Sequence, residues 1–262
     1  MTRQAEKAEV FRALHEGEPF VIPNPWDAGS AKVLAALGFE ALASTSSGFA
    51  FTLGRLDGRV TLDEVIEHAA ALDRATDLPV SIDLENGYGA DPEHAATAIA
   101  RVGEAGAVGG SIEDYDPDGS IYEVGRAVDR IVAAVEAARG FDFPFTLTAR
   151  AENHIRDTPD IDDTISRLQA YEQAGADVLY APGLTLGEIR VLCGAVSRPV
   201  NVLASPQHTV RELVDAGAQR VSVGGDLTWV AVSAMATAAA SIRDDGDLSS
   251  LGTELPVERW LA

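Results

Sequence analysis

This chain of 262 residues contains very little cysteine or lysine. Cys193 is its only cysteine, so no disulfide can form within the chain, and a cytoplasmic setting is expected. We expect Cys193 to be a small packed residue on a helix. The only lysines are Lys7 and Lys32, and both fall in predicted helices. Because a Schiff-base aldolase needs a buried strand lysine, that mechanism is not expected.

Positive charge is also scarce. The chain has 20 Lys and Arg residues against 41 Asp and Glu residues, which gives a formal net charge of −21. A polyanion needs a basic face, so neither nucleic acid nor an anionic membrane is expected as a partner. A small anionic substrate remains compatible, because screening over about 8 Å leaves local cations to decide its binding.

Long hydrophobic runs are absent as well. No apolar stretch approaches the roughly 18–20 residues of a membrane span, and the start of the chain lacks the apolar core of a signal peptide. The composition, 46% hydrophobic and 23% charged, is typical of a globular enzyme. We therefore expect a cytoplasmic protein with no membrane partner.

What the chain does contain is a repeating unit, in which a short apolar stretch is followed by a loop and an Ala-rich helical stretch. Segment 2–16 is predicted as a leading helix. Eight units in about 250 residues predict a single α/β domain over residues 1–262, a (β/α)8 TIM-type barrel with right-handed crossovers. A doubly wound sheet is the alternative, but no Gly-x-Gly-x-x-Gly follows the first strand. The predicted strands are residues 20–23, 41–45, 78–82, 108–112, 143–148, 176–180, 199–203 and 220–223.

Two neighbouring predicted strands end in acidic residues. Asp83 and Glu85 follow the third strand, and Glu113 and Asp114 follow the fourth. Acids where a strand leaves the core are costly unless they are paired, hydrogen-bonded or bound to a cation. Such oxygen ligands suit Mg²⁺ or Mn²⁺ rather than zinc. The simpler alternative is that each acid caps the helix that follows it.

Further polar residues fall at predicted strand ends or in the loops after them, where the active site of such a barrel lies. Arg150 offers a planar fork for a carboxylate. His154 is the only histidine near a strand end; His15, His68 and His94 are predicted on helix surfaces, and no zinc-binding spacing is present. The other residues of this kind are Thr45, Ser46, Asp57, Glu152, Asn201 and Ser205.

Several motifs resemble the isocitrate lyase/phosphoenolpyruvate mutase superfamily. They occur in the family's order and cover the predicted barrel. Individually they are weak, but the ordered set is specific. The matching motifs are Asn24-Pro-Trp-Asp-Ala-Gly-Ser-Ala31, Ser44-Thr-Ser-Ser-Gly48, Gly54-Arg-Leu-Asp-Gly58, Asp83-Leu-Glu-Asn-Gly-Tyr-Gly89, Gly110-Ser-Ile-Glu-Asp114 and Thr148-Ala-Arg150.

The resemblance implies a Mg²⁺ site, with Mn²⁺ as an alternative. Asp83 resembles the direct metal ligand, Glu85 takes the place of a second acid that acts through water, and Glu113 resembles a third acid. Asp57 resembles a gating-loop residue near the reacting centre, and Arg150 the arginine that binds the substrate carboxylate. The remaining predicted substrate-binding residues are Trp26, Thr45, Ser46 and Ser47 from the resemblance, and His154 and Asn201 from their predicted strand ends.

Two departures from the superfamily bear on the reaction. Its lyases carry a Lys-Lys/Arg-Cys-Gly-His loop after the fourth strand, and its mutases carry a lysine there. This chain instead has Tyr115-Asp-Pro-Asp-Gly-Ser120, predicted to lead almost directly into a helix. The lyases' Glu after the sixth strand is replaced by Ala181-Pro-Gly183. Without a cysteine or lysine on that loop, Tyr115 or water must protonate the pyruvate-like enolate expected in such an enzyme, or the enolate is captured by another reactant.

These features predict a Mg²⁺-dependent lyase-type enzyme that breaks or forms a C–C bond next to a 2-oxo acid through a pyruvate-like enolate. The alternatives are a C–P bond enzyme on phosphonopyruvate-like substrates and a non-catalytic metabolite-binding barrel. The resemblance also implies a homotetramer, a dimer of dimers in which the eighth helix is swapped. Residues 227–242 are apolar on nearly every face, as such a helix requires.

Overall fold

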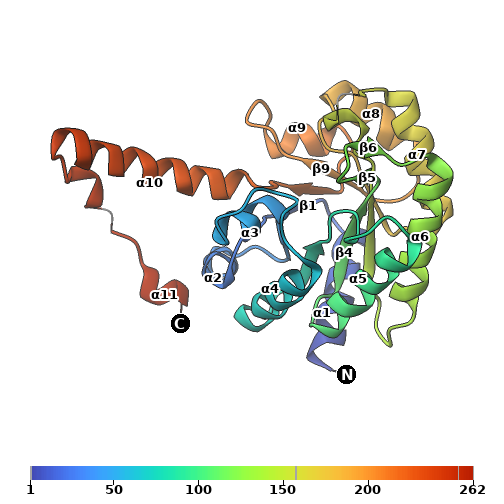
Figure 1. The fold of residues 1–262 in the computed structure, drawn as a ribbon, viewed down its shortest axis with the longest axis horizontal. Helices are drawn as coiled ribbons and strands as arrows, with labels where there is room; N and C mark the ends of the chain where they lie inside the picture. The colour runs from blue at the N-terminus through green and yellow to red at the C-terminus, as the bar shows by residue number, and fades with distance from the viewer. Residues whose placement is uncertain (1, 157, 253, 262) are drawn as a thin grey trace.

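The computed structural model describes residues 2–156, 158–252 and 254–261. Eight parallel strands in the order β1-β10-β9-β8-β7-β4-β3-β2 confirm the predicted barrel (Figure 1). The barrel closes between β2 and the end of β1, where the backbone N–H of Ala43 donates to the carbonyl oxygen of Pro23 at 3.1 Å. The strands are β1 (Phe20–Ile22), β2 (Leu42–Ala43), β3 (Val80–Asp83), β4 (Gly109–Glu113), β7 (Thr146–Arg150), β8 (Val178–Tyr180), β9 (Val200–Leu203) and β10 (Arg220–Ser222).

Helices alternate with the strands and surround most of the barrel (Figure 1). Their starts follow from local capping. At α4, for example, Thr61 and Glu64 form the predicted capping box, with Thr61 N donating to Glu64 Oε2 at 2.9 Å. The helices are α1 (Arg3–Glu16), α2 (Ala28–Ala36), α3 (Ser46–Thr52), α4 (Leu62–Ala75), α5 (Pro92–Glu104), α6 (Val124–Arg139), α7 (Ile161–Gln173), α8 (Leu186–Ala195), α9 (Val210–Asp215), α10 (Asp226–Asp245) and α11 (Val257–Leu261).

Two loops differ from the sequence prediction. The sequence predicts a long loop over residues 46–60, but α3 occupies the first half of this segment. The helix forms there because the Thr45 side chain accepts a hydrogen bond from Gly48 N and Phe49 stacks on His68. His68 is consequently buried, not on a helix surface. After β4 the chain does not run straight into a helix: it forms the hairpin β5 (Tyr115–Asp116) and β6 (Ser120–Ile121).

The inside of the barrel contains a buried cation. Arg220, at the start of β10, is 5% exposed, and its guanidinium donates to Asn201 Oδ1 at 2.8 Å and to Thr148 Oγ1 at 3.0 Å. Its third contact, at 3.1 Å, is His15 of α1, which closes the amino-terminal end of the barrel. Burial lowers the pKa of Arg220 to about 10. The aliphatic core lies mainly between the sheet and the surrounding helices.

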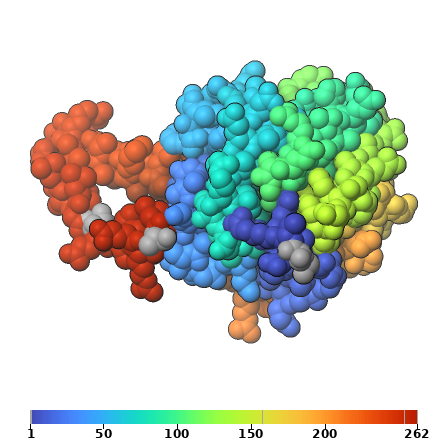
Figure 2. All heavy atoms as spheres, turned by 90° about the horizontal axis from the view of Figure 1, so that it is seen from below, coloured from blue at the N-terminus to red at the C-terminus, as the bar shows by residue number. Residues whose placement is uncertain are grey.

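Beyond its first turn, where Thr228 is buried and Trp229 contacts Phe51 of α3, helix α10 does not pack on the barrel from which it emerges. Figures 1 and 2 show it as an arm that projects away from the rest of the molecule. Thr228 is its only buried residue, and Trp229, Val230 and Met235 are exposed. The chain then returns, and Lys32 Nζ of α2 donates to the carbonyl oxygen of Leu261 at 2.7 Å. Among the described residues, no helix is long and apolar enough to cross a membrane.

Candidate active site

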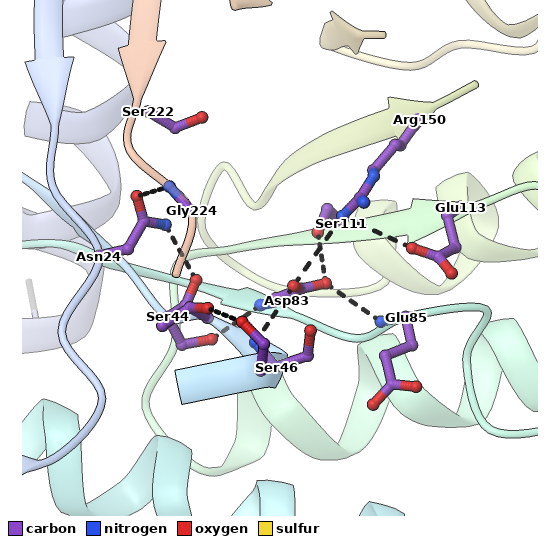
Figure 3. Close-up of polar contacts among 12 residues, drawn as sticks. Asn24, Ser44, Ser46, Asp83, Glu85, Ser111, Glu113, Arg150, Ser222 and Gly224 are labelled. Carbon is purple, nitrogen blue, oxygen red and sulfur yellow. Dashed lines mark hydrogen bonds and ion pairs between the residues drawn. The ribbon is translucent and has the colours of Figure 1, made fainter. Parts of the chain in front are cut away.

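The carboxyl ends of β3, β4 and β7 bring three predicted site residues together. Asp83 pairs in register with Ser111, and Glu113 pairs with Arg150. Since parallel strands end at the same edge, their terminal side chains meet at the mouth of the barrel. Figure 3 shows the Arg150 side chain pointing toward Asp83, with Glu113 on its other side.

Arg150 is surrounded by carboxylates. Its Nη1 lies 3.5 Å from Glu113 Oε2 and 3.9 Å from Asp83 Oδ2, and its Nε donates to Glu152. The guanidinium also lies 5.2 Å from the centre of the Tyr180 ring. Burial by itself would lower the pKa of Arg150, but Glu152 and Glu113 raise it well above its ordinary value. Arg150 therefore stays charged at any pH at which the protein is folded.

The Asp83 carboxylate is held by neighbouring main-chain groups. Oδ2 accepts from Ser46 N at 3.3 Å, and Oδ1 accepts from Glu85 N at 3.2 Å (Figure 3). Asp83 N in turn donates to Ser44 Oγ at 2.9 Å. These bonds fix the carboxylate at the point where β3 leaves the barrel.

The turn after β3 has unusual backbone geometry. Glu85 and Tyr88 have positive φ angles of 48° and 64°. Gly87, at φ 82°, could not carry a side chain, because a Cβ there would lie 2.8 Å from Ala95 Cα. Strained backbone of this kind persists where the surrounding structure enforces it, often at functional sites.

Negative charge accumulates around Asp83. Burial, together with Asp83 and Asp57, raises the pKa of Glu85 to about 7. Burial and Asp83 also raise the pKa of Asp57. Burial raises the pKa of Glu113 well above its ordinary value, although Arg150 opposes the shift. The site therefore holds more carboxylates than its cations neutralise.

Two chambers meet at Arg150. The outer chamber, of about 280 Å³, is lined by half of the predicted site residues, namely Arg150, Ser46, Asp57, Glu85, Glu113 and Tyr115. The inner cavity, of about 60 Å³, lies within the barrel and is lined by Thr45, Asp83, Asn201 and Arg220, among others.

Three predicted site residues line neither chamber. The backbone N–H of Trp26 donates to Ser30 Oγ at the start of α2. Ser47 Oγ lies 3.2 Å from Thr45 Oγ1, beside Gly225. His154 lies next to Gly183, in a 3-10 turn after β7, with Nε2 buried and without a hydrogen-bond partner among the described residues.

Sequence reasoning assigned no role to two residues of this site. Glu152 is fully buried and accepts from both Arg150 and Arg156, the latter at 3.0 Å. Arg156 lines the outer chamber and lies 3.8 Å from the centre of the Tyr115 ring. The strand-end position of Glu152 was a signal that could have been used. Nothing in the sequence indicated that the 3-10 turn would bring Arg156 back to the chamber.

The predicted metal ligands do not converge. In the part of the chain that the structure describes, no three His, Cys, Asp or Glu side chains are grouped closely enough to hold a metal ion. Arg150 lies between Asp83 and Glu113, and the Glu85 carboxylate points away from Asp83 (Figure 3). A metal complex would require these carboxylates to turn toward one another.

Comparisons with known proteins agree with the fold. A crystal structure from Burkholderia cenocepacia J2315, of a protein named only as a lyase/mutase candidate, is 50% identical, with a TM-score of 0.95; the match covers 99% of this chain and 97% of that one. The 2-methylisocitrate lyase of Escherichia coli is 31% identical over 78% of this chain and 74% of its own. The oxaloacetate decarboxylase of Bradyrhizobium sp. is 28% identical over 85% of this chain and 79% of its own.

The family match extends over nearly the whole barrel. It is the family described as phosphoenolpyruvate phosphomutase, and it covers residues 11–243. This range includes every strand of the barrel and all four acids at the ends of β3 and β4. The chain therefore belongs to the phosphoenolpyruvate phosphomutase family, within the isocitrate lyase/PEP mutase superfamily of lyases and mutases.

Proposed function

We propose that this chain is a Mg²⁺-dependent enzyme that breaks or forms a C–C bond next to a 2-oxo acid through a pyruvate-like enolate. The observation that carries the proposal is Arg150, a half-buried guanidinium at the barrel mouth among more carboxylates than it can neutralise. An arginine fork binds a carboxylate through two parallel hydrogen bonds. Similarity to a 2-methylisocitrate lyase and to an oxaloacetate decarboxylase supports this class of reaction.

The chemistry of the surrounding side chains fits a hard divalent cation. Asp83, Glu85 and Glu113 offer only oxygen donors, which suit Mg²⁺ or Mn²⁺. The carboxylates also repel one another, and this repulsion contributes to the raised pKa of Glu85. A bound Mg²⁺ would relieve that repulsion, polarise the 2-oxo group and stabilise the negative charge on the enolate oxygen.

The protein side chains have separate tasks in this scheme. Arg150 binds and orients the substrate carboxylate, and Glu152 holds the Arg150 Nε so that the outer part of the guanidinium faces the chamber. Asp57, from the loop between α3 and α4, lines the chamber near the reacting centre. Tyr115 supplies the proton that converts the enolate into product, and its ring is packed against Arg156.

The test combines metal binding with turnover. Asp83→Ala is expected to abolish Mg²⁺ binding in calorimetry without unfolding the protein, because Asp83 lies at the barrel mouth. Asp77→Ala is the matched control, since the Asp77 side chain is 96% exposed and lines neither chamber. Pyruvate release from a panel of 2-oxo diacids should require Mg²⁺, stop with EDTA and be inhibited competitively by oxalate, an enolate mimic. Equal Mg²⁺ affinity in Asp83→Ala, or release that ignores EDTA and oxalate, would refute the proposal.

The same assay separates the alternative functions. Phosphate or a rearranged phosphonate formed from 3-phosphonopyruvate would indicate C–P chemistry. Ligand binding without turnover of any substrate would indicate a binding protein. The family match to phosphoenolpyruvate phosphomutase is the reason to include the phosphonate in the panel.

A further inference from the structure

The outer chamber has a second arginine whose position the proposed reaction does not explain. Arg156 follows the 3-10 turn after β7, and its side chain is 34% exposed. Its guanidinium lies 3.8 Å from the centre of the Tyr115 ring, within the distance of a cation–π contact. Its Nη2 lies 3.8 Å from Glu113 Oε1. The side chain thus stands at the chamber wall near the hairpin β5–β6.

A single carboxylate links this arginine to Arg150. Glu152, which is fully buried, accepts from Arg150 Nε with one oxygen and from Arg156 Nε with the other. The backbone N–H of Glu152 donates to Asp114 Oδ1 at 2.8 Å, and Asp114 is held by Tyr171 at 2.6 Å. Two cations are therefore fixed by one anion on a rigid support. The two arginines carry one positive charge more than Glu152, and among the described residues the only other carboxylate near both of them is Glu113, at 3.5 Å from Arg150 and 3.8 Å from Arg156.

We propose that Arg156 binds the distal acid group of a substrate whose 2-oxo acid end is bound at Arg150. This inference rests on the proposed function and assigns the part of the site that selects diacids over monoacids. The chamber, of about 280 Å³, is large enough for a four-carbon diacid. The Tyr115 ring limits the movement of the guanidinium and so reduces the entropy lost on binding.

A purely structural role would make a different prediction. If Arg156 only neutralised Glu113 and Glu152, its removal would weaken all ligands alike, because it would disturb the support of Arg150. If it binds the distal group, only ligands that carry that group should be affected. The two roles can therefore be separated by ligands that differ at one end only.

The experiment measures affinities with Mg²⁺ present, by calorimetry, for oxalate and for two ligand pairs. Oxaloacetate is compared with 2-oxobutyrate, and 2-oxoglutarate with 2-oxopentanoate, so that a carboxylate replaces a methyl group in each pair. 3-Phosphonopyruvate tests a distal phosphonate. The variants are Arg156→Met and Arg156→Lys, with Arg126→Met as a matched control, because Arg126 is exposed on α6 and lines neither chamber. Arg59→Met tests the third arginine of the chamber.

In at least one of the two pairs, the wild type should bind the diacid, oxaloacetate or 2-oxoglutarate, more tightly than the corresponding monoacid. Arg156→Met should weaken that diacid roughly 10- to 100-fold and leave oxalate within about twofold. Arg156→Lys should recover part of the loss, and Arg126→Met should change neither affinity. The relative losses of oxaloacetate and 3-phosphonopyruvate identify which distal acid the subsite prefers.

Several results would overturn the assignment. They are a wild type without diacid preference, an equal loss of oxalate and diacid in Arg156→Met, and a loss confined to Arg59→Met. Absence of any Mg²⁺-dependent oxalate binding in the wild type would instead refute the proposed function itself. The melting temperature of each variant shows whether it is folded.

Discussion

At the scale of the residue, the site depends on the shape of one side chain. Arg150 uses Nε for Glu152 and keeps Nη1 near Asp83 and Glu113. A lysine ammonium could not make both sets of contacts, because it is a single point charge on a flexible stem. We therefore expect Arg150→Lys to lower kcat/KM for the preferred 2-oxo acid about 100-fold, the loss typical of a misplaced substrate.

A matched control for this variant is Arg55→Lys. Arg55 bonds to Glu64 at 2.8 Å and lines neither chamber, so its replacement should leave kcat/KM within about twofold. Steady-state pyruvate release measures both variants. Unchanged activity in Arg150→Lys would contradict the proposal that the Arg150 guanidinium binds the substrate carboxylate.

At the scale of the element, the hairpin β5–β6 follows β4 at the edge of the outer chamber. It carries Tyr115, whose ring packs on Arg156 at 3.8 Å. Tyr115→Phe keeps the ring and removes only the hydroxyl. We expect it to lower kcat about 100-fold while the Kd for oxalate stays the same, because a placed proton donor contributes roughly 10²–10⁴-fold.

The control for that prediction is Tyr122→Phe. Tyr122 lies just beyond the hairpin, is buried, and accepts a bond from Asn86 through its hydroxyl, outside both chambers. The variant Tyr122→Phe should lower the free energy of unfolding and leave kcat nearly unchanged. If Tyr115→Phe releases pyruvate as fast as the wild type, the proton comes from water or another group.

Helix α10 carries the prediction about assembly. Its apolar side chains, among them Trp229, Val230 and Met235, remain exposed in the single chain. Contiguous apolar surface of this kind usually marks an interface. We expect the full chain to form a tetramer and a chain without residues 226–262 to form smaller or aggregating species, as light scattering can measure.

The matched control deletes only residues 247–262, which removes α11 and keeps α10. This variant should keep the oligomeric state of the full chain. The single substitution Val230→Asp should weaken the oligomer without unfolding the barrel. If deletion of α10 leaves the same stable oligomer, the swapped-helix arrangement is wrong.

At the scale of the whole molecule, two histidines make the fold sensitive to acid: His68, which is buried, and His15, which is half-buried. Burial lowers the pKa of His68 to about 4, and burial with Arg220 lowers that of His15 to about 3. In the unfolded chain both take up a proton near pH 6.5. The unfolded state therefore binds more protons between pH 6.5 and 4, and the free energy of unfolding falls as the pH is lowered through that range.

The contribution of His68 can be isolated by substitution. It stacks on Phe49 at 3.9 Å, and its Nε2 has no partner among the described residues, so His68→Phe should fit the site. Between pH 7.5 and 5, the wild type should lose about 2 kcal/mol more than this variant, at about 1.4 kcal/mol per pH unit below 6.5. Urea unfolding measures the difference. His94→Gln, at an exposed position, should behave as the wild type does.

The sequence by itself determined the barrel and much of its mouth. The repeated apolar stretches predict eight strands because buried parallel strands need such runs. Parallel strands also end at one edge, so the order of the residues along the chain is enough to place Asp83, Glu113 and Arg150 together. Local capping residues such as Thr61 likewise predict helix starts, since they act on neighbours only a few positions away.

Tertiary structure decided what depends on contacts between distant segments. Only the folded chain shows that His68 is buried under Phe49, that the 3-10 turn brings Arg156 beside Tyr115, and that one carboxylate links two arginines. The local sequence of each segment is compatible with exposure as well as burial. Packing chooses between these states, because its free energy comes from residues far apart in the chain.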